Sequence, residues 1–156
     1  MLALIVAMDE NRGIGLNGFL PWRIKEDLQL FKQKTEGHTI IMGQTTFEGL
    51  PKALPNRHTI VVSADENLNY DDENVSVCND LVSLLVESKE SSDIIYVCGG
   101  NSIYRQALPY VDLLCVSFVK GTYEVDTYFP EINFDDYTIS NEEEYSEFNY
   151  REYRRG

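Results

Sequence analysis

Short apolar and β-branched runs alternate with helical patterns along most of this chain, and this alternation constrains the fold most strongly. The strand-like runs lie at 2–8, 39–42, 58–63, 75–78, 93–98 and 113–119. The helical patterns lie at 23–34, directly after Gly43, at 80–89 and at 101–108. Strands that alternate with helices are typical of α/β proteins with parallel sheets. We therefore expect a mainly parallel central sheet.

The C-terminal part of the chain has a different pattern. Two segments with period-two alternation, at 137–141 and 148–153, flank the acidic run 142–144. Such alternation is typical of antiparallel strands with one exposed face, and a run of like charges suits a solvated turn. We expect a terminal antiparallel hairpin with its turn at 142–144. Because no repeat, linker or shift in composition divides the sequence, we expect a single domain over residues 1–156.

The charge of the chain limits its partners. The sequence has 26 acidic and 13 basic residues, which gives a net charge of -13. This charge repels phosphate backbones and anionic lipids, so we expect neither nucleic-acid nor membrane partners. The acidity fits an ordinary cytosol and, as an alternative, a salt-rich one.

The cysteines, histidines and N-terminal residues favour an intracellular protein. Cys78, Cys98 and Cys115 lie in apolar runs without a CxxC pair, which is typical of reduced core residues. His38 and His58 are isolated, so we assign no metal site. The N-terminus lacks the basic segment of a signal peptide, and no apolar run approaches the ~18 residues of a membrane span. We expect a cytoplasmic monomer.

A glycine-rich segment follows the first predicted strand. Residues 13–18 read Gly-Ile-Gly-Leu-Asn-Gly and match the G-x-G-x-x-G pattern of dinucleotide-binding loops. In that pattern the last glycine already lies in a helix, whereas here Pro21 marks the first turn of a helix that begins later. We therefore expect a flexible loop over 13–20 in which glycines adopt backbone conformations that other residues avoid, and which can act as a lid.

Asp27 has an unusual position in the predicted helix 23–34. At about 100° per residue, it falls among the apolar side chains of one helix face, which are Ile24, Leu28 and Phe31. A buried, ionised carboxylate costs several kcal/mol unless it is paired, and no basic residue shares this face. Asp27 therefore bonds a distant backbone amide, lies partly exposed at the helix edge, or awaits a ligand.

Three further segments suggest ligand binding. The runs 43–46 (Gly-Gln-Thr-Thr) and 99–102 (Gly-Gly-Asn-Ser) each connect a strand end to a helix, and such turns suit phosphate groups. In a parallel sheet both turns lie at the carboxyl edge, where they could hold the two ends of one dinucleotide. The proline-stiffened segment 50–57 ends at Arg57, whose planar guanidinium suits a carboxylate. Each signal alone has low specificity.

Together and in this order, these segments resemble the dihydrofolate reductase family over essentially the whole chain. The resemblance rests on Leu20-Pro21-Trp22 with Asp27 and Phe31, Ile40 to Gly43, Leu54-Pro55 with Arg57, Gly99-Gly100 with Ile103-Tyr104, and Asp126 to Pro130. It implies an α/β fold with a mainly parallel central sheet, C-terminal antiparallel strands and helices on both faces. It also implies reduction of 7,8-dihydrofolate to 5,6,7,8-tetrahydrofolate with NADPH, in support of one-carbon and thymidylate metabolism, and inhibition by antifolates.

The resemblance assigns roles to residues around the substrate. Asp27 would accept hydrogen bonds from the two-donor edge of the pterin and stabilise the positive charge that grows as N5 is protonated. Trp22 and Leu20 complete the implied catalytic set, and a water molecule admitted by the loop 13–20 would donate the proton. Arg57 would bind the α-carboxylate of the glutamate tail. The other implied substrate contacts are Ile5, Leu28, Phe31, Lys32, Leu50, Lys52, Leu54 and Ser117, the last as the hydroxyl beside Asp27.

The resemblance also assigns residues to NADPH, and the bond between Gly99 and Gly100 is a candidate for a cis peptide. The implied cofactor contacts are Ala7, Gly13, Ile14, Gly15, Leu16, Asn17, Gly18, Gly43, Gln44, Thr45, Thr46, Ser63, Ala64, Cys98, Gly99, Gly100, Asn101, Ser102, Ile103, Tyr104 and Thr127. Gln44 replaces an arginine common in the family, and Ala64 replaces a hydroxyl. Because both changes remove contacts to the 2'-phosphate, we expect reduced discrimination between NADPH and NADH.

Two other functions are alternatives to dihydrofolate reduction. A pyrimidine reductase of the riboflavin pathway shares the implied fold, but it would not be expected to combine Asp27, Leu20-Pro21-Trp22 and Arg57. A non-catalytic folate-binding module would bind antifolates without oxidising NADPH.

Overall fold

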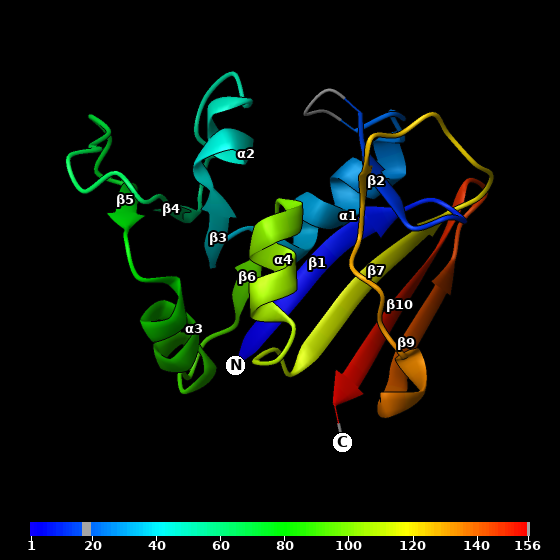
Figure 1. The fold of residues 1–156 in the computed structure, drawn as a ribbon. Helices are drawn as coiled ribbons and strands as arrows, with labels where there is room; N and C mark the ends of the chain where they lie inside the picture. The colour runs from blue at the N-terminus through cyan, green and yellow to red at the C-terminus, as the bar shows by residue number, and fades with distance from the viewer. Residues whose placement is uncertain (17–19, 156) are drawn as a thin grey trace.

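A computed structural model describes residues 1–16 and 20–155 of the protein. Within these residues, an eight-stranded sheet has the order β5-β4-β3-β6-β1-β7-β10-β9 (Figure 1). Its strands are β1 (Leu2–Met8), β3 (Thr39–Gly43), β4 (His58–Val62), β5 (Val75–Cys78), β6 (Ile95–Val97), β7 (Leu113–Val119), β9 (Tyr137–Glu144) and β10 (Phe148–Arg155). The helices are α1 (Lys25–Thr35), α2 (Gln44–Glu48), α3 (Leu81–Lys89), α4 (Asn101–Ala107) and the 3-10 helix η1 (Phe134–Asp136). None of the described helices has the length and apolar character needed to cross a membrane.

The sheet is mainly parallel, as predicted. The strands β1, β3, β4, β5, β6 and β7 pair in parallel, whereas β10 is antiparallel to both β7 and β9. Parallel strands place their carboxyl ends at one edge, where ligands bind in open α/β sheets. At this edge the peptide N–H of Cys98 donates to the carbonyl of Ile41 at 2.8 Å, and that of Gly43 donates to Gly99 at 2.9 Å. The ends of β3 and β6 therefore lie side by side.

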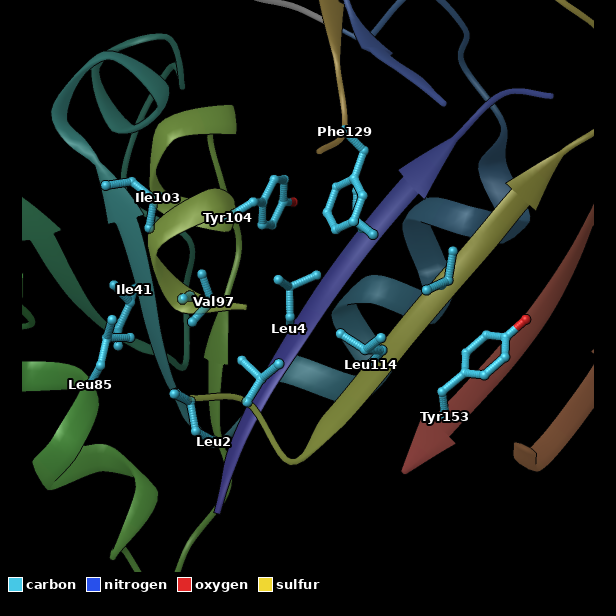
Figure 2. Packing of buried hydrophobic residues seen from close by; sticks show 14 of the residues in the cluster. Leu2, Leu4, Ile41, Leu85, Val97, Ile103, Tyr104, Leu114, Phe129 and Tyr153 are labelled. Atoms are coloured by element: carbon cyan, nitrogen blue, oxygen red, sulfur yellow. The ribbon is translucent and has the colours of Figure 1, made fainter. Parts of the chain in front are cut away.

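Helices cover both faces of the sheet, which confirms the predicted architecture. Alternate residues of β1 face opposite ways: Leu2 and Leu4 pack with residues of α3 and α4, whereas Ala3 and Ile5 pack with residues of α1. Figure 2 shows the first of these cores, with Leu4 beneath Tyr104 of α4 and Leu2 nearer to Leu85 of α3. The second core lies beneath α1 and contains the apolar part of the candidate site.

The C-terminal hairpin was predicted correctly, but its turn was not. The strand β9 continues through 142–144, which pair with 149–151 of β10. The turn lies at 145–147 and is closed by the N–H of Tyr145 donating to the carbonyl of Phe148 at 2.9 Å. Since β9 is an edge strand and residues 142–144 are all exposed, the strand tolerates three successive glutamates there. Glu142 pairs with Arg151 at 3.0 Å.

The first helix begins later than its sequence pattern predicted. The helix α1 starts at Lys25, and Ile24 is an extended N-cap residue with φ -116° and ψ 109°. Trp22 and Ile24 are buried whereas Arg23 is exposed, which is the period-two pattern of an extended chain. Pro21 therefore lies outside the helix, in the segment that inserts Trp22 into the second core.

The prediction of a flexible glycine loop was wrong for residues 13–15. These residues form β2 (Gly13–Gly15), which pairs with β8 (Thr127–Tyr128) in a small antiparallel sheet. A Cβ on Gly13 would lie 2.8 Å from Cγ2 of Val125 and 2.9 Å from Oδ1 of Asp9, and its φ is not positive. Glycine is thus needed here for close packing. Asn17 and Gly18 lie outside the described residues.

Candidate active site

Asp27 is a buried carboxylate near the start of α1. It is 8% exposed, and the hydroxyl of Ser117 on β7 donates to its Oδ1 at 2.6 Å. Burial raises the pKa of Asp27, and the hydrogen bond from Ser117 lowers it by less. Within the described residues no basic side chain forms an ion pair with Asp27. Among the described residues, the carboxylate therefore has a hydroxyl partner but no countercharge.

Side chains that were predicted to contact the substrate or the cofactor gather in the second core, together with Trp22. The buried members Ile5 and Trp22 share this cluster with partly buried side chains at its border, which are Ala7, Phe31, Leu50, Leu54 and Cys98. The large side chains of Leu28 and Leu20 are 41% and 46% exposed. The prediction that Leu28 belongs to a buried helix stripe was therefore wrong. Leu30 is buried in its place.

Trp22 places the polar atom of its indole ring in a buried position. Its indole ring is 8% exposed and lies 5.1 Å from the ring of Tyr123, centroid to centroid, with the planes at 57°. The indole Nε1 is buried and has no hydrogen-bond partner among the described residues. Because buried donors are normally paired, this atom is a candidate donor to a bound molecule.

Arg57 is a buried cation without a described carboxylate partner. It is 6% exposed, its Nε donates to the carbonyl of Pro55 at 2.9 Å, and one terminal nitrogen donates to Oγ1 of Thr35 at 3.0 Å. Burial lowers the pKa of Arg57. No acidic group of the described chain lies within ion-pair distance of it. Neutral partners thus fix the guanidinium, which can still bind an anion.

The glycine turns at the ends of β3 and β6 meet the first turn of α2. The Gly99-Gly100 peptide bond is cis, as the family resemblance suggested. A Cβ on Gly100 would lie 3.1 Å from Oγ1 of Thr46, so the two turns are in close contact. Oδ1 of Asn101 is buried and has no partner in the described part of the chain. Small residues, hydroxyls and an unpaired buried amide oxygen fit the polar groups of a dinucleotide.

Gln44, the first residue of α2, contacts Ser63, which follows β4 directly. The hydroxyl of Ser63 donates to Oε1 of Gln44 at 2.7 Å, and Nε2 of Gln44 donates to Glu48 at 3.2 Å. Ala64 is exposed. The amide of Gln44 is therefore held by neighbouring side chains and adds no positive charge.

The remaining predicted cofactor residues of the described chain belong to α2, α4, β8 and the segment that contains β2. Ile14 packs against the first core, which includes Ile103 and Tyr104. The Tyr104 hydroxyl donates to the carbonyl of Ile5 at 2.8 Å and so joins α4 to β1. The others are the half-buried Leu16, the exposed Thr45 and Ser102, and Thr127, which pairs with Gly15.

Two predicted substrate residues lie away from the buried set. Lys32 and Lys52 are exposed, and Lys32 is 3.9 Å from Glu36 of the same helix. Sequence reasoning also missed Thr35, which is fully buried and bonds Arg57. A threonine at the end of a polar helix gave no signal for this contact.

Comparison with known proteins agrees with this geometry. A family model described as dihydrofolate reductase matches residues 1–155. The dihydrofolate reductase of Staphylococcus haemolyticus is 38% identical over 136 residues, 87% of this chain and 80% of that protein. That of Mycoplasma genitalium is 34% identical over 159 residues, 99% of this chain and 98% of that protein.

A solved structure extends the agreement to three dimensions. The dihydrofolate reductase from Enterococcus faecalis, complexed with NADP(H) and RAB-propyl, has a TM-score of 0.89 and 32% sequence identity. The match covers 100% of this chain and 96% of that chain. This chain belongs to the dihydrofolate reductase family.

Proposed function

We propose that this protein reduces 7,8-dihydrofolate to 5,6,7,8-tetrahydrofolate with NADPH, as a cytoplasmic monomer with a single domain over residues 1–156. The reaction would support one-carbon and thymidylate metabolism. The observation that carries the proposal is Asp27, which is buried, bonded to Ser117 and without a cationic partner in the described chain.

Asp27 orients the substrate and stabilises charge. A pterin presents an exocyclic amine and a ring N–H on one edge, and a carboxylate can accept both hydrogen bonds. As N5 gains its proton, positive charge develops on the heterocycle, and a fixed anion in a low-dielectric site stabilises this charge. The hydroxyl of Ser117 keeps the carboxylate in place. Asp27 therefore acts electrostatically, and a water molecule supplies the proton to N5.

Apolar side chains surround this carboxylate and exclude bulk water. Ile5 and Phe31 belong to the second core and would contact the flat ring, together with Leu50 and Leu54. Exclusion of water strengthens the interaction of Asp27 with the developing charge. The unpaired indole Nε1 of Trp22 would hold the water that donates the proton.

Arg57 is the proposed partner of the glutamate tail. Its guanidinium is buried, fixed by Pro55 and Thr35, and unpaired with any described carboxylate. The α-carboxylate of the tail can accept two hydrogen bonds from such a fork. The exposed Lys32 and Lys52 would add positive charge at the outer end of the site.

The chemistry that NADPH would supply when bound is the transfer of a hydride to C6 of the pterin. The glycine turns at the ends of β3 and β6, the hydroxyls of Thr45 and Thr46 and the unpaired oxygen of Asn101 would bind it. Near Gln44 and Ser63 the chain offers neutral groups to the 2'-phosphate, and a charge-assisted bond to phosphate contributes roughly 1.5–3 kcal/mol. The ratio of kcat/KM for NADPH to that for NADH should therefore be smaller than in an arginine-bearing relative. An equal ratio would refute this expectation.

One assay separates this proposal from its alternatives. The absorbance of reduced nicotinamide is followed after dihydrofolate and NADPH are mixed with the protein. Oxidation that depends on dihydrofolate and stops with an antifolate supports the proposal. Oxidation only with a pyrimidine substrate would indicate the pyrimidine reductase. Antifolate binding without oxidation would indicate a binding module.

A further inference from the structure

Asp9 is a buried carboxylate outside the site described above. It follows β1 directly and is 2% exposed. Its Oδ1 accepts hydrogen bonds from the backbone N–H groups of Asn11 at 2.9 Å and Gly13 at 2.7 Å. Its Oδ2 accepts from the N–H of Tyr123 at 3.0 Å, 114 residues further along the chain. One side chain therefore joins the turn before β2 to the segment after β7.

Three backbone N–H groups donate to the side chain at position 9, and a carboxylate can accept all three hydrogen bonds. A carboxylate only accepts hydrogen bonds, whereas an amide has one accepting oxygen and one donating NH₂. With asparagine at position 9, either Gly13 and Asn11 or Tyr123 would face a donor instead of an acceptor. Among the described residues no basic side chain pairs with Asp9, so these backbone donors hold the anion.

The segment held by Asp9 also contacts the candidate active site. The ring of Tyr123 lies 5.1 Å from the indole of Trp22, with the planes tilted by 57°. Tyr123 is 39% exposed, whereas Trp22 is 8% exposed within the second core. In Figure 1 the segment between β7 and β8 passes beside β2, at the carboxyl edge of the sheet. The backbone bond from Asp9 thus sets where the Tyr123 ring meets Trp22.

We propose that Asp9 is a positioning residue for Trp22. It fixes the backbone of Tyr123, and the Tyr123 ring holds the indole in the wall of the active site. Loss of the Asp9 contacts releases Tyr123 and exposes the indole to solvent. The coupling to Trp22 stands on these contacts alone, and only its effect on turnover rests on the proposed function.

Trp22 is the single tryptophan of the chain, so its fluorescence reports on this contact directly. In the variant Asp9→Asn, we expect the emission to shift to longer wavelength and the acrylamide quenching constant to rise about twofold as the indole becomes exposed. The matched control is Asp80→Asn at the N-cap of α3, where Asp80 accepts from the N–H and the hydroxyl of Ser83. Because asparagine caps a helix about as well as aspartate, the control should remain folded and leave the fluorescence unchanged. Unchanged quenching in folded Asp9→Asn would overturn the proposal.

A second pair of variants tests the contact between the Tyr123 ring and Trp22. This test applies even if Asp9→Asn does not fold. Tyr123→Phe keeps the ring and should retain the quenching of the native protein, whereas Tyr123→Leu should raise it. Equal quenching in Tyr123→Phe and Tyr123→Leu would overturn the proposal. In the double variant Asp9→Asn with Tyr123→Leu, the two effects should not add, because both act through one ring. Additive effects would also contradict it.

Turnover then shows whether the contact matters for the reaction. Both Asp9→Asn and Tyr123→Leu should lower kcat/KM for dihydrofolate by about tenfold, and Asp80→Asn should leave it unchanged. If the native protein does not reduce dihydrofolate but the quenching changes as expected, the proposed function fails and the positioning role stands. If the native protein reduces dihydrofolate but the quenching does not respond to the variants, the positioning role fails and the proposed function stands.

Discussion

The buried carboxylate of Asp27 lowers the stability of the folded protein, and a bound ligand can offset this loss. Burial raises the pKa of Asp27, so the folded state binds this proton more tightly than the unfolded state does. The ionised carboxylate therefore lowers the stability at neutral pH. This loss disappears as the pH falls through the raised pKa towards the ordinary value. A carboxylate kept under these conditions is typical of a functional site.

Removal of this charge should therefore stabilise the free protein. In Asp27→Asn the amide oxygen still accepts from Ser117, but no charge is buried. We expect a free energy of unfolding at neutral pH that equals or exceeds that of the native protein, with a difference that shrinks at acidic pH. Chemical denaturation over a range of pH measures it. A variant that is less stable at neutral pH and gains relative stability on acidification would contradict the assignment.

Arg57 yields a second prediction for a single residue. The variant Arg57→Lys keeps the charge but loses the planar fork, which is worth roughly 1.5–3 kcal/mol for a charged pair. KM for dihydrofolate should rise by about ten- to a hundredfold, with a small change in kcat. A pterin substrate without the glutamate tail is the control, and its KM should be the same in both proteins. An equal rise in KM for both substrates would show that Arg57 supports the folded structure and does not bind the glutamate tail.

At the scale of elements, the sequence predicted most of the sheet because hydrophobic periodicity is a local signal. The bounds of β1, β5 and β7 agree with their sequence patterns. The small sheet of β2 and β8 was missed, since it pairs Gly13 with Tyr128 and neither segment is apolar enough to indicate a strand. The predicted turn at 142–144 was wrong because charge was taken as a sign of a turn, whereas an edge strand exposes the same residues.

The candidate site was also predicted only in part, because some of its contacts have a local sequence signal and others join residues that are far apart in the sequence. Asp27, Arg57 and the glycine turns stand out against their local pattern, so the sequence alone singles them out. Thr35 and Asp9 act on residues that are 22 and 114 positions away, and no local pattern contains those partners. The cationic contact expected from the family at Gln44 is replaced by an amide that accepts from Ser63 and donates to the Glu48 carboxylate.

The packing of β2 provides a test at the scale of elements. Gly13→Ala places a methyl group 2.8 Å from Val125, and such overpacking costs about 1–3 kcal/mol of stability. The control is Gly49→Ala, where φ is -77° and the new Cβ would meet its nearest atom at 3.5 Å, with a change within about 0.5 kcal/mol. Adding Val125→Ala to Gly13→Ala should restore part of the loss. Equal stability of the two alanine variants in thermal unfolding would contradict the packing argument.

For the whole molecule, the net charge of -13 sets the response to salt. Self-repulsion destabilises the compact state, and added salt screens it over about 10 Å at 0.1 M. We expect the melting temperature to rise from low to moderate NaCl concentration. The rise should be smaller at a pH of about 4.5, where many carboxylates are protonated. A melting temperature that does not respond to salt at neutral pH would show that the charges are already compensated.

The most direct test of the account is the turnover of Asp27→Asn as a function of pH. A fixed anion that stabilises developing charge in a low-dielectric site is worth about 10²–10³ in rate. We predict a loss of this size in kcat/KM for dihydrofolate at neutral pH, in a protein that remains folded. The gap to the native enzyme should narrow at low pH, where the substrate arrives already protonated. Near-native turnover of Asp27→Asn at neutral pH would contradict the central role of this carboxylate.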